Sequence, residues 1–284
     1  MGSVIAGVAL AALASVLFNA AIVIQAGEAR AVPDELGLRV SLIARLIRRP
    51  RWLLGAALAL TAFPLQTVAL LWAPLTAVQP ADATGLLVLL VLGARMLGER
   101  VGRREVVAVT AIVTGIVLLT IAAPRREVTH VDSGDVLLPM LAVAFVALAP
   151  LVLRRWVGAG SIAVIVGAGF AFALGAFCAK IVADAIDRQA WLVAAVMVGV
   201  AALAAFVGTL TEQTALQRRQ ATQVAPMIFA VELLVPVALA VLVVGEDWRH
   251  GGTVGVVSGL VLVVGGAASL GRAPTVARML EAGS

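Results

Sequence analysis

Five ionisable side chains lie inside long apolar stretches of this 284-residue sequence: Asp82, Lys180, Asp184, Glu212 and Glu232. A charge in a hydrocarbon environment costs free energy, so each group must be paired, neutralised or placed beside water. Glu232 lies near the middle of its stretch, and no helix end or neighbouring charge in the sequence accounts for it. We therefore expect Glu232 to relay protons or to ligate a cation. A structural hydrogen bond between helices is the alternative.

Asp82 follows Pro80 by two residues and has two interpretations. If Pro80 is the first residue of a helix, Asp82 lies in the first turn, where the helix dipole stabilises a carboxylate. The functional alternative is an oxygen ligand for a cation. Because Mg²⁺ binds carboxylates and keeps several of its waters, Asp82 and Glu232 together are a candidate metal site.

Four further polar residues are candidates for binding a substrate. Glu212 and Gln213 lie one to two helical turns before the arginine pair at 218–219, so an ion pair at the membrane interface is the expected role of Glu212. Gln66 and Gln213 occupy equivalent positions of an internal repeat. They either line opposite ends of one cavity or hydrogen-bond between helices. Asn19, in the first apolar stretch, is a further candidate lining residue.

The composition excludes most soluble classes of protein. The chain is 62% apolar and 13% charged, with a mean hydropathy of +1.08, and this is typical of an integral membrane protein. The high isoelectric point (≈ 11.1) comes from arginines in short segments between apolar stretches, so we expect contact with membrane lipid and none with nucleic acid. The motifs of nucleotide-binding loops, zinc hydrolases and serine hydrolases are absent. We expect neither an enzymatic activity nor a cofactor.

The apolar stretches predict nine membrane spans, at about 3–26, 52–73, 77–97, 106–123, 136–153, 159–186, 190–214, 220–245 and 252–271. With the 27–51 loop in the cytoplasm, sixteen arginines lie on the cytoplasmic side and four on the other: Arg125, Arg126, Arg188 and Arg249. The positive-inside rule then puts the N-terminus outside and the C-terminus inside a plasma membrane. All five tryptophans fall at predicted span ends, where indole rings prefer the headgroup layer.

Two stretches of the chain repeat each other about 146 residues apart. The segments 65–70, 76–80, 98–99 and 114–115 correspond to the segments 212–216, 222–226, 245–246 and 258–259. Each copy spans three apolar stretches, and an odd number of stretches separates the copies. The copies must therefore cross the membrane in opposite directions, and this arrangement is the signature of many secondary transporters.

The segment between the first two spans predicts a helix of its own. Pro33, Asp34 and Glu35 favour a helix start, and apolar residues follow at helical spacing up to Pro50. We expect a cytoplasmic amphipathic helix over 34–49 that lies on the membrane and is attracted to anionic lipid. An ordinary basic connector is the alternative.

These features together resemble the drug/metabolite transporter superfamily of EamA-like carriers. The residues that carry the resemblance are Val78-Gln79-Pro80, Leu97-Gly98-Glu99-Arg100 and Thr114-Gly115, with Val224-Ala225-Pro226, Gly245-Glu246 and Ser258-Gly259 in the second half. Within that superfamily the chain is most similar to the NIPA-type branch, through Ala73-Pro74, Gln213 and Gly245-Glu246-Asp247-Trp248. The resemblance implies a ten-span fold, with one span missing here between the first span and 52–73, and Mg²⁺ as a substrate.

The sequence thus predicts an all-α integral membrane protein, with about nine transmembrane helices in two inverted repeats. The first half covers residues 1–133, with four spans and the amphipathic helix, and the second covers 134–284, with five. The expected function is secondary transport of a small solute or cation by alternating access, with Mg²⁺ as one candidate. A carrier of lipid-linked or amphiphilic molecules and a non-transporting scaffold for cell-envelope proteins are the alternatives. A homodimer is compatible with each of these three functions.

Overall fold

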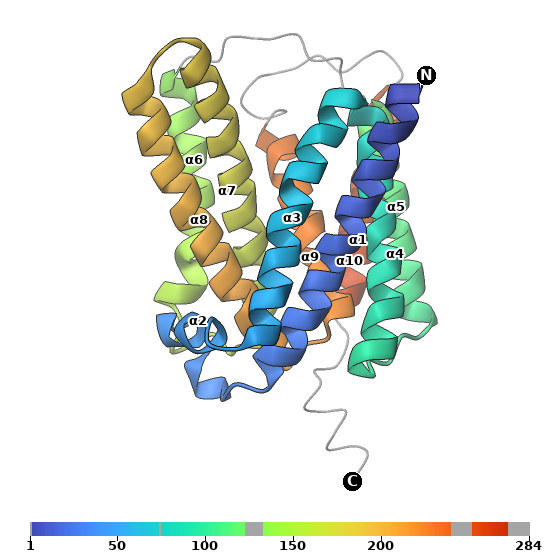
Figure 1. Ribbon diagram of the computed structural model, residues 1–284, viewed down its shortest axis with the longest axis vertical. Helices are drawn as coiled ribbons and strands as arrows, with labels where there is room; N and C mark the ends of the chain where they lie inside the picture. Colours follow the sequence, from blue (N-terminus) through green and yellow to red (C-terminus); the bar gives the residue numbers. More distant parts are fainter. Residues whose placement is uncertain (1, 74, 123–132, 240–251, 272–284) are drawn as a thin grey trace.

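The structure is a computed structural model that describes residues 2–73, 75–122, 133–239 and 252–271. Within those ranges the regular elements are all helical, and no strand occurs (Figure 1). The helices in chain order are α1 (Gly2–Arg30), η1 (Asp34–Leu36), α2 (Val40–Leu46), α3 (Pro50–Trp72), α4 (Leu75–Leu97), α5 (Arg103–Ala122), α6 (Ser133–Val152), α7 (Ile162–Asp187), α8 (Trp191–Arg218), α9 (Ala221–Leu239) and α10 (Gly252–Gly271).

The long helices coincide with the predicted spans. Six of them, α1, α3, α5, α7, α8 and α10, contain described stretches long and apolar enough to cross a membrane. The described parts of α4, α6 and α9 hold shorter apolar stretches, Gly85–Leu97, Leu137–Val152 and Ala221–Val235. Large apolar side chains on the outside of the bundle, such as Phe145 at 76% exposure, would meet lipid chains rather than water. An all-α membrane protein is therefore confirmed, and the total of nine spans stays a prediction.

The helices form a bundle around α9. Helix α1 packs against α3 and α4, helix α7 packs against α6 and α8, and α5 pairs with α10 (Figure 1). Helix α9 contacts α1, α4, α5, α7, α8 and α10. Because its neighbours come from both halves of the chain, side chains of α9 are the ones best placed to contact both halves at once.

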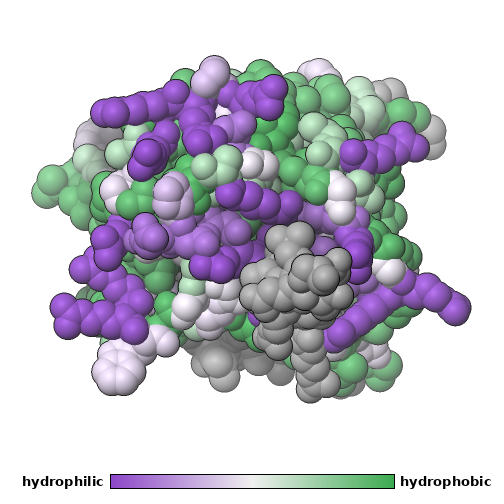
Figure 2. Space-filling view, turned by 90° about the horizontal axis from the view of Figure 1, so that it is seen from below, coloured by the Kyte–Doolittle hydropathy of each residue, from purple (hydrophilic) through white to green (hydrophobic). Residues whose placement is uncertain are grey.

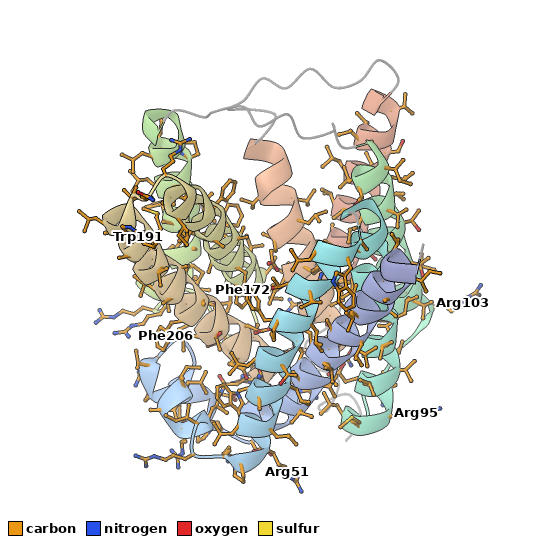
Figure 3. All side chains as sticks on the ribbon, turned by 45° about the horizontal axis from the view of Figure 1, so that its top comes forward. Arg51, Arg95, Arg103, Phe172, Trp191 and Phe206 are labelled. Atoms are coloured by element: carbon orange, nitrogen blue, oxygen red, sulfur yellow. The ribbon has the colours of Figure 1, made fainter. Side chains whose placement is uncertain are left out.

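The two ends of the bundle differ in polarity. Helix α1 begins at the upper end in Figure 1, and α10 ends at the lower end. The lower face is rich in hydrophilic residues (Figure 2), and Arg51 and Arg95 extend from this end (Figure 3). The arginine-rich segments predicted to face the cytoplasm therefore gather on one face of the molecule.

The predicted amphipathic helix over 34–49 is corrected by the structure. It is divided into the single turn η1 and the seven-residue α2, because Leu38 has a left-handed backbone (φ 57°) that no α-helix accommodates. The apolar face of α2 lies against the protein and not only against lipid. Leu42 and Leu46 are fully buried in a cluster with Trp52 and Leu210. Protein contacts therefore bury much of the apolar face that the sequence pattern assigned to a membrane surface.

Helices α5 and α10 approach each other closely at two glycines. A Cβ atom on Gly115 would lie 2.7 Å from the carbonyl oxygen of Gly259, and a Cβ atom on Gly259 would lie 2.8 Å from that of Gly115. The flanking contacts are reciprocal too, since Gly115 faces Val263 and Gly259 faces Leu119. Only a residue without a side chain fits at either position.

Two further close contacts between helices occur, one in each half of the chain. A Cβ atom on Gly85 of α4 would overlap with the hydroxyl of Ser15 on α1. In the second half, a Cβ atom on Gly169 of α7 would lie 2.5 Å from the Cβ atom of Val231 on α9. A glycine thus permits the close contact in each half.

Candidate functional site

Glu212 and Glu232 are carried by two helices that contact each other, α8 and α9. Glu212 lies on α8 and is 7% exposed, and Glu232 lies on α9 and is partly buried. Neither carboxylate makes a hydrogen bond or an ion pair with another residue in the described part of the chain. Both therefore lie inside predicted spans with their oxygens available to a proton, a metal ion or a cationic group.

The ion pair predicted for Glu212 is wrong. Arg218 instead pairs with Asp34, at 2.6 Å between Nη2 and Oδ2. Arg219 donates from Nε to the carbonyl oxygen of Gly160 (2.7 Å) and from Nη1 to that of Gly271 (3.2 Å). Both arginines reach towards the loops and helix ends of the lower face, while Glu212 lies at least one turn further up α8. The short distance along the sequence suggested the two arginines as partners of Glu212, but both bind other groups.

Asp82 does not occupy the first turn of a helix. Helix α4 begins at Leu75, five residues before Pro80, so Asp82 lies about two turns into the helix. The interpretation as a residue that complements the helix dipole is therefore wrong, because that effect fades beyond the first turn. The side chain of Asp82 lies outside the described part of the structure, and its role as a ligand stays a prediction.

Gln213 connects three helices. It is fully buried, its Nε2 donates to Oε1 of Gln25 on α1 (2.8 Å), and its Oε1 accepts from the indole nitrogen of Trp52 on α3 (3.2 Å). Gln66 is partly buried about 21 Å further along α3 than Trp52, taking 1.5 Å per residue. The two glutamines therefore lie towards opposite ends of the bundle, and Gln213 acts as an interhelical hydrogen-bonding group.

Asn19 lies at the close contact between α1 and α4. It is 4% exposed, and its Nδ2 donates to the carbonyl oxygen of Ser15 (2.8 Å) beside Gly85. This donor is satisfied within its own helix, so the structure places Asn19 in the packing between the two helices. No group of three or more His, Cys, Asp or Glu side chains that could hold a metal ion occurs among the described residues.

The most connected acid of the described structure is Glu99, to which sequence reasoning gave no role of its own. Helix α4 ends at Leu97, and Gly98 follows in a left-handed conformation (φ 64°) that turns the chain inwards. Glu99 is 7% exposed, forms an ion pair with Arg30 of α1, and accepts hydrogen bonds at the start of α9. Its oxygens accept from the backbone N–H of Ala221 (2.7 Å) and from the N–H (2.9 Å) and hydroxyl (2.6 Å) of Thr222.

Glu99 thereby holds together the lower ends of four helices. The carboxylate satisfies N–H groups that the first turn of α9 leaves without helical partners, and it is favoured by the dipole of that helix. Arg30 also donates to the carbonyl oxygens of Leu216 (3.4 Å) and Arg219 (3.3 Å) at the end of α8. The only sequence signal was the Gly98-Glu99 pair at the end of a span, which marks a helix end but names no partner.

Side-chain hydrogen bonds continue along the lower end of α8. Thr214 accepts from the backbone N–H of Leu38 (3.0 Å), and Gln217 donates to the carbonyl oxygens of Val32 (3.2 Å) and Pro33 (3.3 Å). Every residue from Leu210 to Gln217 is buried. The lower end of the bundle is therefore tightly packed around α8, below the two carboxylates.

No family model, curated protein or solved structure matches this chain.

Proposed function

We propose that this protein is a multi-pass transporter that moves a cation or a cationic solute by alternating access. The observation that carries the proposal is the pair of carboxylates, Glu212 and Glu232, in the interior of the bundle. Both lie in predicted spans, come from adjacent helices, and have no hydrogen-bonding or ionic partner among the described residues. Two ionised carboxylates inside a membrane protein cost free energy unless they bind a proton or another positive charge.

The packing of the helices supports an inverted repeat. Gly115 and Gly259 are repeat mates that contact each other reciprocally, as residues close to a two-fold axis must. Helices α1, α3 and α4 pack together as α7, α8 and α9 do, so the packing favours α1 and α7 as counterparts. On that pairing α6 has no counterpart in the first half, and the repeat consists of four helices. The sequence resemblance implied a span missing after the first helix. On this pairing the difference between the two halves is instead the additional helix α6.

The membrane orientation that we propose has the lower face of Figure 1 in the cytoplasm of a cell with this protein in its plasma membrane. The support is the sixteen-to-four distribution of arginines along the sequence and the hydrophilic character of this face (Figure 2). Nine spans then put the N-terminus outside and the C-terminus inside. The packing around Glu99 and Arg219 then lies at the cytoplasmic end of the bundle.

The carboxylate pair also bears on the identity of the cargo. Mg²⁺ binds hard oxygen ligands and retains several waters, so two carboxylates suffice for a site that keeps an inner hydration shell. Protons and organic cations are bound by the same groups, and a proton that shares the pair would couple transport to the proton gradient. The resemblance to the NIPA-type branch makes Mg²⁺ the first cargo to test, with Glu212 taking the place that the sequence assigned to Asp82.

The proposal is tested by flux into proteoliposomes that contain a pH-sensitive dye or a Mg²⁺-sensitive dye. Wild-type protein is expected to move Mg²⁺, protons or an organic cation from a small panel, and Glu232→Gln to abolish the flux. The matched control is Glu105→Gln, because Glu105 is a buried glutamate whose carboxylate accepts from the N–H of Gly102 (2.9 Å) at the start of its own helix. Flux of a fluorescent phospholipid with no cation flux would favour the lipid carrier, and no flux of either would favour the scaffold.

A further inference from the structure

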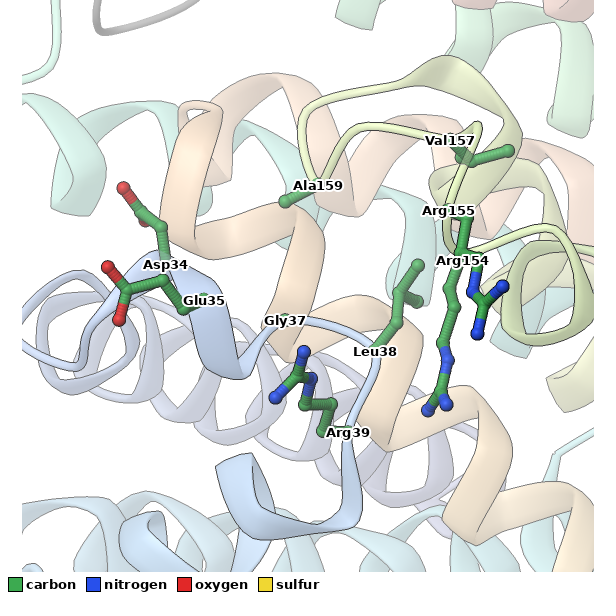
Figure 4. Close-up of a pocket in the computed structure, with 9 residues that line it drawn as sticks. All are labelled: Asp34, Glu35, Gly37, Leu38, Arg39, Arg154, Arg155, Val157 and Ala159. Carbon is green, nitrogen blue, oxygen red and sulfur yellow. The ribbon is translucent and has the colours of Figure 1, made fainter.

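We propose that a pocket on the lower face binds a phosphate group, presented by the headgroup of a membrane phospholipid. The pocket has a volume of about 370 Å³ and lies between the η1–α2 segment and the turn that joins α6 to α7. Three arginines line it: Arg39 from the first segment, and Arg154 and Arg155 from the second (Figure 4). The transport proposal assigns no role to this site, and the inference does not depend on it.

The charges in the pocket are separated. The carboxylates of Asp34 and Glu35 lie at one end, Arg154 and Arg155 lie at the other, and the guanidinium group of Arg39 lies between them (Figure 4). Asp34 is already paired with Arg218. Arg39, Arg154 and Arg155 have no ion pair or side-chain hydrogen bond among the described residues. Three like charges that face one pocket repel one another unless an anion lies between them.

Helix α8 holds both walls of the pocket in place. On one side, Leu38 is 5% exposed, and its N–H donates to Thr214, so the backbone next to Arg39 is fixed. On the other side, Arg219 donates to the carbonyl oxygen of Gly160, at the end of the α6–α7 turn. Guanidinium groups carried on two fixed segments recognise the oxygens of a phosphate by paired, charge-assisted hydrogen bonds.

The position of the pocket favours a lipid as the source of the phosphate. Trp156 follows the two arginines directly and is 88% exposed, and Leu153 precedes them at 47% exposure. An exposed indole next to basic residues at a span end is typical of the headgroup layer of a membrane. A headgroup phosphate at this depth would lie within reach of the pocket, while the acyl chains would extend along the apolar surface of α6.

The test measures binding to the purified full-length protein in a neutral detergent. The probes are a short-chain phosphatidylglycerol, inorganic phosphate, and a short-chain diacylglycerol that lacks the phosphate. The double variant Arg154→Gln/Arg155→Gln is compared with Arg51→Gln/Arg95→Gln, which removes two exposed arginines from the same end outside the pocket. We expect phosphatidylglycerol to bind the pocket variant about tenfold or more weakly, because charge-assisted contacts are lost, and the control less than about twofold.

Arg154→Lys/Arg155→Lys keeps the charge and is expected to bind more weakly than wild type, since lysine lacks the planar fork. Binding of inorganic phosphate with the same dependence on the variants supports a phosphate site open to either source, and binding of the lipid alone supports the headgroup. Equal losses in the pocket and control variants, no loss in either, equal binding of the diacylglycerol, or no binding of any probe would overturn the proposal.

Discussion

Replacing Glu99 with glutamine is expected to destabilise the protein more than any other single isosteric change at the lower end. The substitution removes the charge that pairs with Arg30 and that faces the first turn of α9. It also places an NH₂ group where one carboxylate oxygen now accepts from Ala221 or from Thr222, so two donors would face each other. Leaving the partly buried Arg30 without its partner costs about 3 kcal/mol of stability. This figure includes the loss of the charge-assisted hydrogen bonds.

A loss of about 3 kcal/mol corresponds to roughly a hundredfold change in the unfolding equilibrium. The matched control is Glu28→Gln, which breaks the ion pair of Glu28 with Arg49 (2.9 Å between Oε2 and Nη1). That pair lies between segments of the first half only and is more exposed, with 33% and 16% of the two side chains accessible. Partly exposed pairs contribute about 1 kcal/mol or less.

The assay is unfolding of the purified protein in mixed micelles with increasing denaturing detergent, followed by tryptophan fluorescence. Glu99→Gln is expected to unfold at a clearly lower fraction of denaturing detergent than wild type, and Glu28→Gln close to wild type. If both variants unfold together, Glu99 is not the link between the halves that its contacts indicate.

Three further predictions concern packing and topology. Gly259→Val places side-chain atoms against the carbonyl of Gly115 and is expected to cost about 1–3 kcal/mol by overpacking, measured in the same unfolding assay, whereas Gly265→Val, with open space at its Cβ, should unfold near wild type. Gln213→Leu leaves the buried indole N–H of Trp52 and the amide oxygen of Gln25 without their partner, so it is expected to cost about 1–3 kcal/mol, and an unchanged stability would contradict the hydrogen-bonded role. A cysteine in place of Arg51, in a background with Cys178→Ala, is expected to react with a membrane-impermeant maleimide only from the cytoplasm, and labelling from outside would reverse the topology.

The helices were predictable because their signal is local. A run of about 20 apolar residues must form a helix in a membrane, since its backbone groups have no other partners, and Pro50 marks the start of α3. The sequence pattern also matched Gly115 with Gly259 as equivalent positions of the predicted repeat. The sequence showed where glycines occur, but it did not show that these two contact each other.

The partners of the buried acids were not predictable. Glu99 binds Ala221 and Thr222, more than a hundred residues away, and no periodicity in the chain encodes that contact. Glu212 was assigned to the nearest arginines because sequence distance was the only guide. The prediction of one continuous amphipathic helix over 34–49 failed for the same reason. The contact that fixes Leu38 in a left-handed conformation comes from Thr214 of α8, which is distant in the sequence.

The central claim is that Glu212 and Glu232 bind the transported cation. It is tested most directly by solid-supported membrane electrophysiology, in which a jump in Mg²⁺, proton or organic-cation concentration displaces charge when the cation binds inside the protein. For at least one of these cations, we expect a transient current in wild type, a smaller one in Glu212→Gln, and none in the double variant Glu212→Gln/Glu232→Gln, with Glu105→Gln equal to wild type. Currents of full size in a folded double variant, or no current with any of the three in wild type, would contradict the claim.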